Sequence, residues 1–240
     1  MADTPSGDPI RYRYTFRFAN GAEKRFDINL DPVTLAMIPP EMPSRPDWTK
    51  LDHHQCEQCP LPDSAAYCPV AVNLAGLVET FKDTFSHEDV SLTVETAQRT
   101  YSKQTSLQQG LSSMIGIYMV TSDCPIMDKL RPNARYHLPF ASAEETMYRA
   151  ISMYLTAQYF RMKRGEAPDW TLEHFSEVYK GVWRVNKGIT DRIAHASVQD
   201  ANVNAVIVLS TYGVALDNYL DDCLGEVAPF FNPSAKSEQR

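Results

Sequence analysis

The chain lacks the sequence patterns of several large enzyme classes. Its 240 residues include only 10 glycines, and these form neither a phosphate-binding loop nor a dinucleotide-binding fingerprint. There is no Gly-x-Ser-x-Gly elbow of a serine hydrolase. There is also no Glu-x-x-His pair of the kind that a di-iron helical bundle uses. We therefore predict no catalytic residue, and a non-catalytic protein is favoured over an enzyme.

The chain also lacks long apolar segments and an excess of positive charge. Its most apolar stretch, residues 203–216, is interrupted by polar residues and is too short to cross a membrane. The first residues carry neither the basic nor the apolar region of a signal peptide. The net charge of -7 disfavours phosphate-rich partners. We therefore expect a cytoplasmic protein that binds neither membrane nor nucleic acid. An unknown protein partner and a homo-oligomer both stay open.

An N-terminal β-hairpin is the first element that the sequence predicts. Apolar side chains alternate with arginines and threonine over residues 10–18, and a similar alternation returns over residues 25–30. A period of two is typical of a half-buried strand. Asn20 and Gly21 supply a turn between the two strands. The alternation at residues 90–94 predicts one further strand, with an extension towards residue 101.

Helical spacing of apolar residues dominates the rest of the chain. It predicts helices over residues 69–85, 106–120, 143–164, 171–196 and 197–224, and shorter helical segments near 32–37 and 125–130. Ser142 and Glu145 form a capping box at the start of one long helix. Gly165 and Gly225 are placed to end helices.

These elements predict an α+β fold. It comprises an N-terminal β-hairpin plus one further strand, a cysteine-rich loop and a helical C-terminal half. We assign the hairpin and the cysteine region to residues 10–140. Residues 141–232 form a helical region that packs on the first part, because three strands make a thin sheet that needs covering. Residues 1–9 and 233–240 are predicted to be disordered tails.

Cysteine is scarce but unevenly placed. Three of the five cysteines, Cys56, Cys59 and Cys68, lie within thirteen residues. An odd count in a chain expected in the cytosol argues against a disulfide framework. A Cys-x-x-Cys pair places two thiolates on one turn, where both can reach one metal. We predict that Cys56, Cys59, Cys68 and the distant Cys124 form one metal site. Cys223 is interpreted as a small apolar side chain.

Proline follows three of these cysteines, and this repetition is what connects Cys124 to the others. If Pro69 and Pro125 occupy first helical positions, then Cys68 and Cys124 stand at helix N-caps. A helix dipole lowers the pKa of a thiol at such a position and favours the thiolate that binds metal.

Two metals fit four cysteines, zinc and the iron of a 4Fe-4S cluster. Pro60 stands where zinc-ribbon turns usually have glycine, which favours iron–sulfur. His53 and His54 favour zinc, because imidazole suits this ion and either ring could replace a cysteine ligand. We predict zinc (Zn), with the 4Fe-4S cluster as the alternative.

The cysteine segment resembles an uncharacterised bacterial protein family. The resemblance rests on His54-Gln-Cys56-x-x-Cys59-Pro-Leu and on Tyr67-Cys68-Pro-Val-Ala-Val-Asn73-Leu, together with the hairpin over residues 10–30. It covers roughly the first third of the chain. It implies that the hairpin and the cysteine segment form one unit, and it carries no mechanism across.

Three functions remain open from the sequence. The first is a soluble metal-binding protein with structural zinc and an interaction or regulatory role. The alternative is an iron–sulfur protein with a redox or sensing role. The third is an enzyme with a pocket near Arg131–His137, where Arg131, Arg135 and His137 could form a small anion site. No nucleophile–base pair is visible in the sequence to support the third function.

Overall fold

The computed structural model describes residues 7–38, 45–218 and 220–231. It does not describe the side chains of residues 212–218, 221 and 223. The predicted tail at residues 233–240 and most of the one at residues 1–9 therefore lie outside the described residues, as does the Cys223 side chain.

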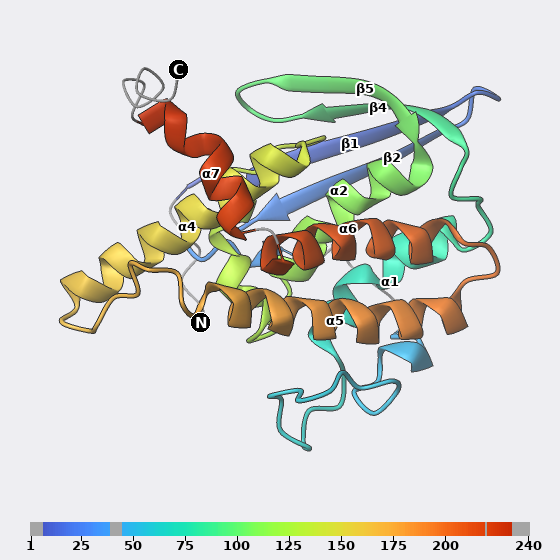
Figure 1. Ribbon diagram of the computed structural model, residues 1–240. Coiled ribbons are helices and arrows are strands. Elements are labelled where there is room, and N and C mark those ends of the chain that lie inside the picture. The colour runs from blue at the N-terminus through green and yellow to red at the C-terminus, as the bar shows by residue number, and fades with distance from the viewer. Residues whose placement is uncertain (1–6, 39–44, 219, 232–240) are drawn as a thin grey trace.

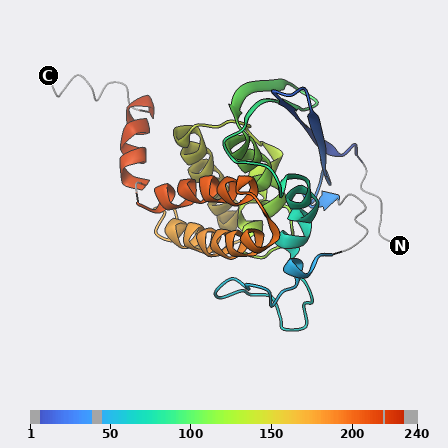
Figure 2. The same ribbon diagram turned by 90° about the vertical axis from the view of Figure 1, so that its right-hand side faces the viewer.

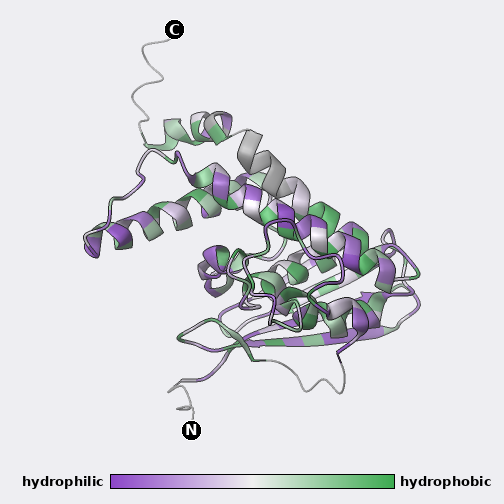
Figure 3. Cartoon of the chain, turned by 90° about the horizontal axis from the view of Figure 1, so that it is seen from below, coloured by the Kyte–Doolittle hydropathy of each residue, from purple (hydrophilic) through white to green (hydrophobic). Residues whose placement is uncertain are grey.

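Five antiparallel strands form one sheet in the order β3-β2-β1-β4-β5. Their bounds are β1 Ile10–Phe18, β2 Glu23–Leu30, β3 Met37–Ile38, β4 Asp89–Glu95 and β5 Thr100–Ser106. The predicted hairpin is confirmed, and Gly21 at its turn has a φ of 83° that favours glycine. Apolar and polar residues alternate in colour along the strands (Figure 3).

The sheet has two strands that the sequence did not predict. Strand β5 lies at the edge of the sheet and buries no side chain fully. Its sequence, Thr-Tyr-Ser-Lys-Gln-Thr-Ser, is accordingly polar. Strand β3 is only two residues long, too short for any periodicity. The predicted helical turn near residues 32–37 is a single turn, closed by a hydrogen bond from the Leu35 N–H to the Asp31 carbonyl oxygen at 3.0 Å, and β3 follows it from Met37. The Asp31 carboxylate accepts hydrogen bonds from the backbone N–H groups of Val33 and Thr34 and folds this segment as an Asx turn.

The helical C-terminal half is confirmed. The helices are α1 Pro69–Phe81, α2 Leu107–Val120, α3 Pro132–Arg135, α4 Ala143–Lys163, α5 Phe175–Ala196, α6 Ala201–Asn218 and α7 Leu220–Phe231, with short 3₁₀ helices η1 Asp47–Thr49 and η2 Met127–Leu130. Ser142 and Glu145 make both hydrogen bonds of the predicted capping box. Gly165 follows the end of α4 with a φ of 80°.

Several helix boundaries differ from the prediction. Helix α5 begins at Phe175 rather than residue 171, and α6 begins at Ala201 rather than residue 197. Helix α1 ends at Phe81 rather than residue 85, and Ser86 beyond it donates a hydrogen bond from its backbone N–H to Asp200. The long last helix divides into α6 and α7, and Gly225 lies inside α7 instead of ending it. The segment after Cys124 begins as a turn and becomes 3₁₀ helix only at Met127.

The helices cover one face of the sheet. Figures 1 and 2 show α1 and α2 between the sheet and an outer layer formed by α5 and α6. The other face carries Arg13 and Arg17, which pair with Asp27 and Glu23 across the β1–β2 register. One apolar core contains residues of both halves, from Tyr14 of β1 to Ile193 of α5. In the described part of the chain, no helix is long and apolar enough to span a membrane.

Candidate metal centre

Cys56 and Cys59 stand at the two ends of a tight turn in the loop that follows η1. The Cys59 backbone N–H donates to the Cys56 carbonyl oxygen at 3.1 Å. Gln58, between them, has a φ of 59°, the left-handed conformation that β-turns use at their third position. In Figure 1 this loop projects below α1 and α5, away from the sheet. The turn therefore presents both sulfur atoms from one short segment.

Cys68 is the N-cap residue of α1, as predicted from Pro69. Its backbone N–H donates to the Thr49 carbonyl oxygen at 2.8 Å, and Lys50 pairs with Tyr67 in an isolated β-bridge. These contacts connect the two ends of the cysteine loop. Cys68 is therefore held where the loop returns to the helical layer.

Cys124 reaches the same cavity from the end of α2. It follows the end of α2 through Asp123, whose φ of 64° reverses the chain. Its carbonyl oxygen accepts from the Asp128 N–H at 2.9 Å, and the backbone N–H groups of Met127 and Ile126 bond to its sulfur. Cys124 thus stands at the start of a turn and 3₁₀ helix rather than at a regular helix N-cap.

All four cysteines line one small cavity. Its volume is about 20 Å³, and its walls are mainly apolar, with Val70 from α1 and Val185, Gly188 and Ile189 from α5 among them. All four are free thiols. The structure therefore brings together the four residues that the sequence singled out, including the distant Cys124.

Two residues of α5 that the sequence analysis overlooked shape this cavity. A Cβ atom on Gly188 would lie 2.9 Å from the Cβ and 3.1 Å from the Cα of Cys56, so only glycine permits this close approach. Arg192 is 2% exposed, and its guanidinium donates hydrogen bonds to the carbonyl oxygens of Trp48, Lys50 and Leu51. Arg192 thereby fixes the start of the cysteine loop and places a positive charge beside the thiols.

Cys124 is buried, and the other three cysteines are partly buried. Burial, followed by the proximity of the Cys59 thiol, raises the pKa of Cys56 to about 12. Burial also raises the pKa of Cys124, although backbone N–H groups oppose the shift. The prediction that a helix dipole lowers the thiol pKa is therefore wrong for Cys124, because burial outweighs the N–H groups. Burial lowers the pKa of Arg192. The neighbouring Cys68 acts in the opposite direction, because a negative charge there would raise the pKa of the guanidinium.

His53 and His54 do not line the cysteine cavity, in the part of the chain that the structure describes. Their rings face His195 in the last turn of α5, with centroid distances of 5.9 Å from His53 and 4.4 Å from His54. The arrangement does not favour either histidine as a substitute for a cysteine ligand.

The predicted anion site of Arg131 and Arg135 does not form. The Arg131 guanidinium pairs with the carboxylates of Asp123 and Asp128, and the Arg135 side chain is exposed. A larger cavity of about 440 Å³ nevertheless lies next to this segment, between β5, α2, α4 and His137. Two cations, Lys103 and Arg149, line it, whereas no aspartate or glutamate of the described chain does so.

A polar cluster joins this larger cavity to the sheet. The Tyr14 hydroxyl lies 2.5 Å from His137 Nε2, and the Ser113 hydroxyl lies 3.1 Å from the Tyr14 hydroxyl and 3.4 Å from the same ring nitrogen. Burial lowers the pKa of His137 to about 3, so the ring is neutral at pH 7. The sequence analysis missed Tyr14 and Ser113, because only the fold brings them to His137.

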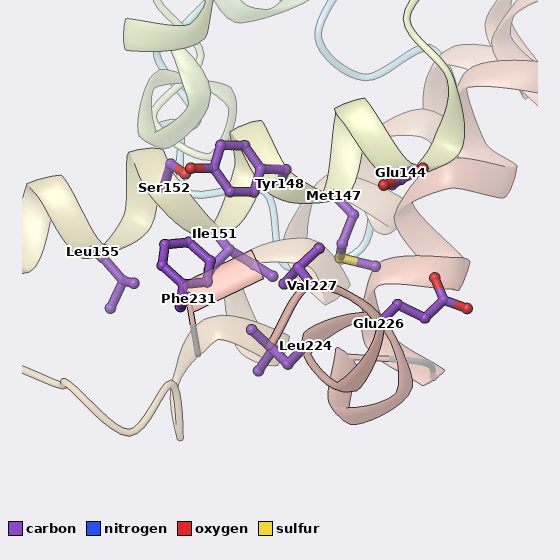
Figure 4. Close-up of a pocket in the computed structure, with 10 residues that line it drawn as sticks. All are labelled: Glu144, Met147, Tyr148, Ile151, Ser152, Leu155, Leu224, Glu226, Val227 and Phe231. Atoms are coloured by element: carbon purple, nitrogen blue, oxygen red, sulfur yellow. The ribbon is translucent and has the colours of Figure 1, made fainter. Parts of the chain in front are cut away.

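A third cavity, of about 310 Å³, lies between α4 and α7 (Figure 4). Apolar side chains from both helices, among them Ile151, Leu155, Val227 and Phe231, line most of it. The residues that line it include two acids, Glu144 and Glu226, and no cysteine or histidine. This cavity offers shape and apolar contact rather than metal-binding chemistry.

Comparison with known proteins gives one match. The family model described as "Domain of unknown function (DUF6901)" matches residues 10–232, so the predicted membership of an uncharacterised family is confirmed. No curated protein and no solved structure matches the chain. The match says nothing about the cysteines or their ligand.

Proposed function

We propose that this chain, which belongs to the DUF6901 family of domains of unknown function, is a metal-binding protein whose site consists of Cys56, Cys59, Cys68 and Cys124. The proposal rests on one observation: all four cysteines line the same cavity. Two of them come from the loop, one from the N-cap of α1 and one from the turn after α2. Four thiolates are a common ligand set for structural zinc and for iron–sulfur clusters.

We take zinc as the leading metal. A cavity of about 20 Å³ has room for roughly one small ion, since a single water needs ~10–15 Å³. A 4Fe-4S cluster has eight atoms and would require the loop to move outward. Four thiolates around Zn²⁺ carry a formal charge of -2, and the buried Arg192 guanidinium offsets part of it. The iron–sulfur protein with a redox or sensing role remains the alternative.

The role that follows is structural. The metal would connect the loop at residues 51–68 to the N-cap of α1 and to the turn at Cys124. A non-catalytic protein stabilised in this way, with an interaction or regulatory task in the cytoplasm, is the function that the site supports best. Its partner is a protein or a second copy of the chain, because the net charge of -7 disfavours nucleic acid.

Metal content and the absorption spectrum of anaerobically purified protein test this proposal. A colourless protein that contains zinc supports the leading form. A brown protein with iron and sulfide supports the iron–sulfur alternative. Absence of any metal under both aerobic and anaerobic preparation contradicts both.

A second candidate function, an enzyme with a pocket near Arg131–His137, is favoured by the cavity beside His137. Its volume of about 440 Å³ falls in the range of small-molecule sites. The His137 ring nitrogen lies 3.4 Å from the Ser113 hydroxyl, a candidate nucleophile, and Lys103 and Arg149 favour an anionic substrate. A serine-reactive phosphonate should label the wild type and leave Ser113→Ala unlabelled. An unlabelled wild type contradicts the enzyme.

A further inference from the structure

Three of the six histidines of the chain gather outside the cysteine cavity. His53 and His54 follow each other in the loop, and His195 lies on α5. One ring nitrogen from each lies within 4.8 Å of the others. We propose that these three imidazoles bind a second metal ion, a first-row divalent ion such as Zn²⁺, at a site separate from the four cysteines.

The hydrogen bond of His195 leaves one nitrogen available to the ion. Its Nδ1 lies 2.8 Å from the carbonyl oxygen of Asp191, one turn earlier in α5. A carbonyl only accepts, so Nδ1 carries the proton and donates, and Nε2 keeps a free lone pair. Histidines that bind metals typically use the second nitrogen in this way, which fixes both the tautomer and the orientation of the ring.

His53 supplies an independent sign that a ligand is expected. Its Nε2 atom is buried and has no hydrogen-bond partner among the described residues. A buried polar atom without a partner costs roughly 1–3 kcal/mol, so such atoms are rare unless something satisfies them. The neighbouring rings of His54 and His195 stand at 4.8 Å and 5.9 Å from the His53 ring. A metal ion among the three rings would satisfy this nitrogen.

The backbone of His54 explains how two consecutive side chains meet at one place. Its φ of 47° is left-handed, whereas consecutive side chains of an extended segment point to opposite sides. Histidine is among the residues that adopt this conformation more often than most. The local fold of the loop therefore presents both imidazoles towards α5.

The distances fit a metal after a small movement. Zn–N bonds of about 2.0–2.1 Å in a tetrahedral site place ligand nitrogens roughly 3.3–3.4 Å apart. The farthest pair must therefore approach by roughly 1.5 Å, and the side chains of His54 and His195 are both exposed. Imidazole selects zinc, copper or nickel over calcium and magnesium. Three ligands leave a fourth position for water.

Both sites would hold the same loop against the same helix, through different residues of α5. Gly188 and Arg192 face the cysteines, whereas His195 faces the two histidines. The second site does not require the first, because none of its ligands lines the cysteine cavity. Its occupancy can therefore be measured separately.

Zinc stoichiometry of the full chain tests the inference. The protein is stripped with a chelator, reconstituted with Zn²⁺ under reducing conditions, and its zinc per chain is measured by metal analysis and titration calorimetry. The wild type should bind two equivalents, and His54→Ala and His195→Gln should each bind one. His174→Ala, an exposed histidine at the other end of α5, should keep both and serves as the matched control.

Four further outcomes separate the two sites. Cys124→Ser should lose the other equivalent and keep the one that depends on His195. A wild type with one equivalent that the histidine variants remove would overturn the cysteine site and support this one. A wild type whose single equivalent survives in His54→Ala and His195→Gln would overturn the second site. With Co²⁺, the wild type should show bands from both sites, and His195→Gln should lose only the visible bands that have no thiolate charge-transfer absorption.

Discussion

Gly188 is the position where one added methyl group tests the geometry of the cysteine site. An alanine Cβ would meet the Cβ of Cys56 at 2.9 Å and its Cα at 3.1 Å. The second contact is with backbone, so rotation of a side chain cannot relieve it. The turn that carries Cys56 and Cys59 must move outward from α5, away from Cys68 and Cys124.

The expected magnitude follows from two opposing effects. Overpacking a close contact by one methyl group costs about 1–3 kcal/mol. Alanine in a helix interior is favoured over glycine by roughly 0.5–1 kcal/mol, a gain that does not depend on the metal. Only the clash distinguishes the metal-bound form, in which the loop is held in place, from the metal-free form, in which it can move. Zinc affinity should therefore fall by about 5- to 150-fold, since ~1.4 kcal/mol is a factor of ten.

Competition with a zinc chelator of known affinity measures the effect. Gly76→Ala is the matched control, because Gly76 lies inside α1 with nothing within 4 Å of a Cβ placed there. It should raise the free energy of unfolding by about 0.5–1 kcal/mol and leave zinc affinity unchanged. If Gly188→Ala binds zinc as tightly as Gly76→Ala does, the placement of Cys56 against α5 is refuted.

Three further predictions concern the surroundings of the sites. Arg192→Met should lower the free energy of unfolding by about 3 kcal/mol in urea titrations, because the carbonyl oxygens of Trp48, Lys50 and Leu51 lose a charged donor; a change below ~1 kcal/mol would contradict this. Burial holds the pKa of His137 at about 3, so between pH 6.5 and 3 the unfolded chain binds a proton that the folded chain does not. Stability should then fall by up to about 1.4 kcal/mol per unit as the pH drops, and His137→Asn should lose this slope. Ser142→Ala should cost about 1 kcal/mol in thermal unfolding through loss of the capping box, and an unchanged Tm would argue against that cap.

Local signals account for the parts of the fold that the sequence predicted. The hairpin followed from a period of two around Asn20-Gly21, and α4 followed from its capping box and from Gly165. Strand β5 was missed because an edge strand with polar side chains has no apolar period, and its pairing with β4 is what defines it. The division between α6 and α7 also escaped prediction, since the same helical spacing continues through both segments.

The candidate site was predictable only where spacing within the sequence carries the information. Cys56, Cys59 and Cys68 are near neighbours in the chain, and Cys124 was added through the Cys-Pro pattern. The structure brings it to the others although the helix that motivated the inference starts only at Met127. Arg192 lies on the same face of α5 as Val185 and Ile189. Its position among these apolar residues could have predicted a buried cation from the sequence. The meeting of His53 and His54 with His195 depends on tertiary structure alone.

Metal content of Cys124→Ser, compared with Cys223→Ser and the wild type, tests the central claim most directly. All three proteins are purified anaerobically and dialysed against a weak chelator before analysis. Cys124→Ser should lose the tightly held metal and unfold at a lower temperature, because it removes one of four ligands and the connection between the loop and η2. Cys223→Ser should retain the metal. Equal metal content in the two variants would contradict the assignment of Cys124 as the fourth ligand.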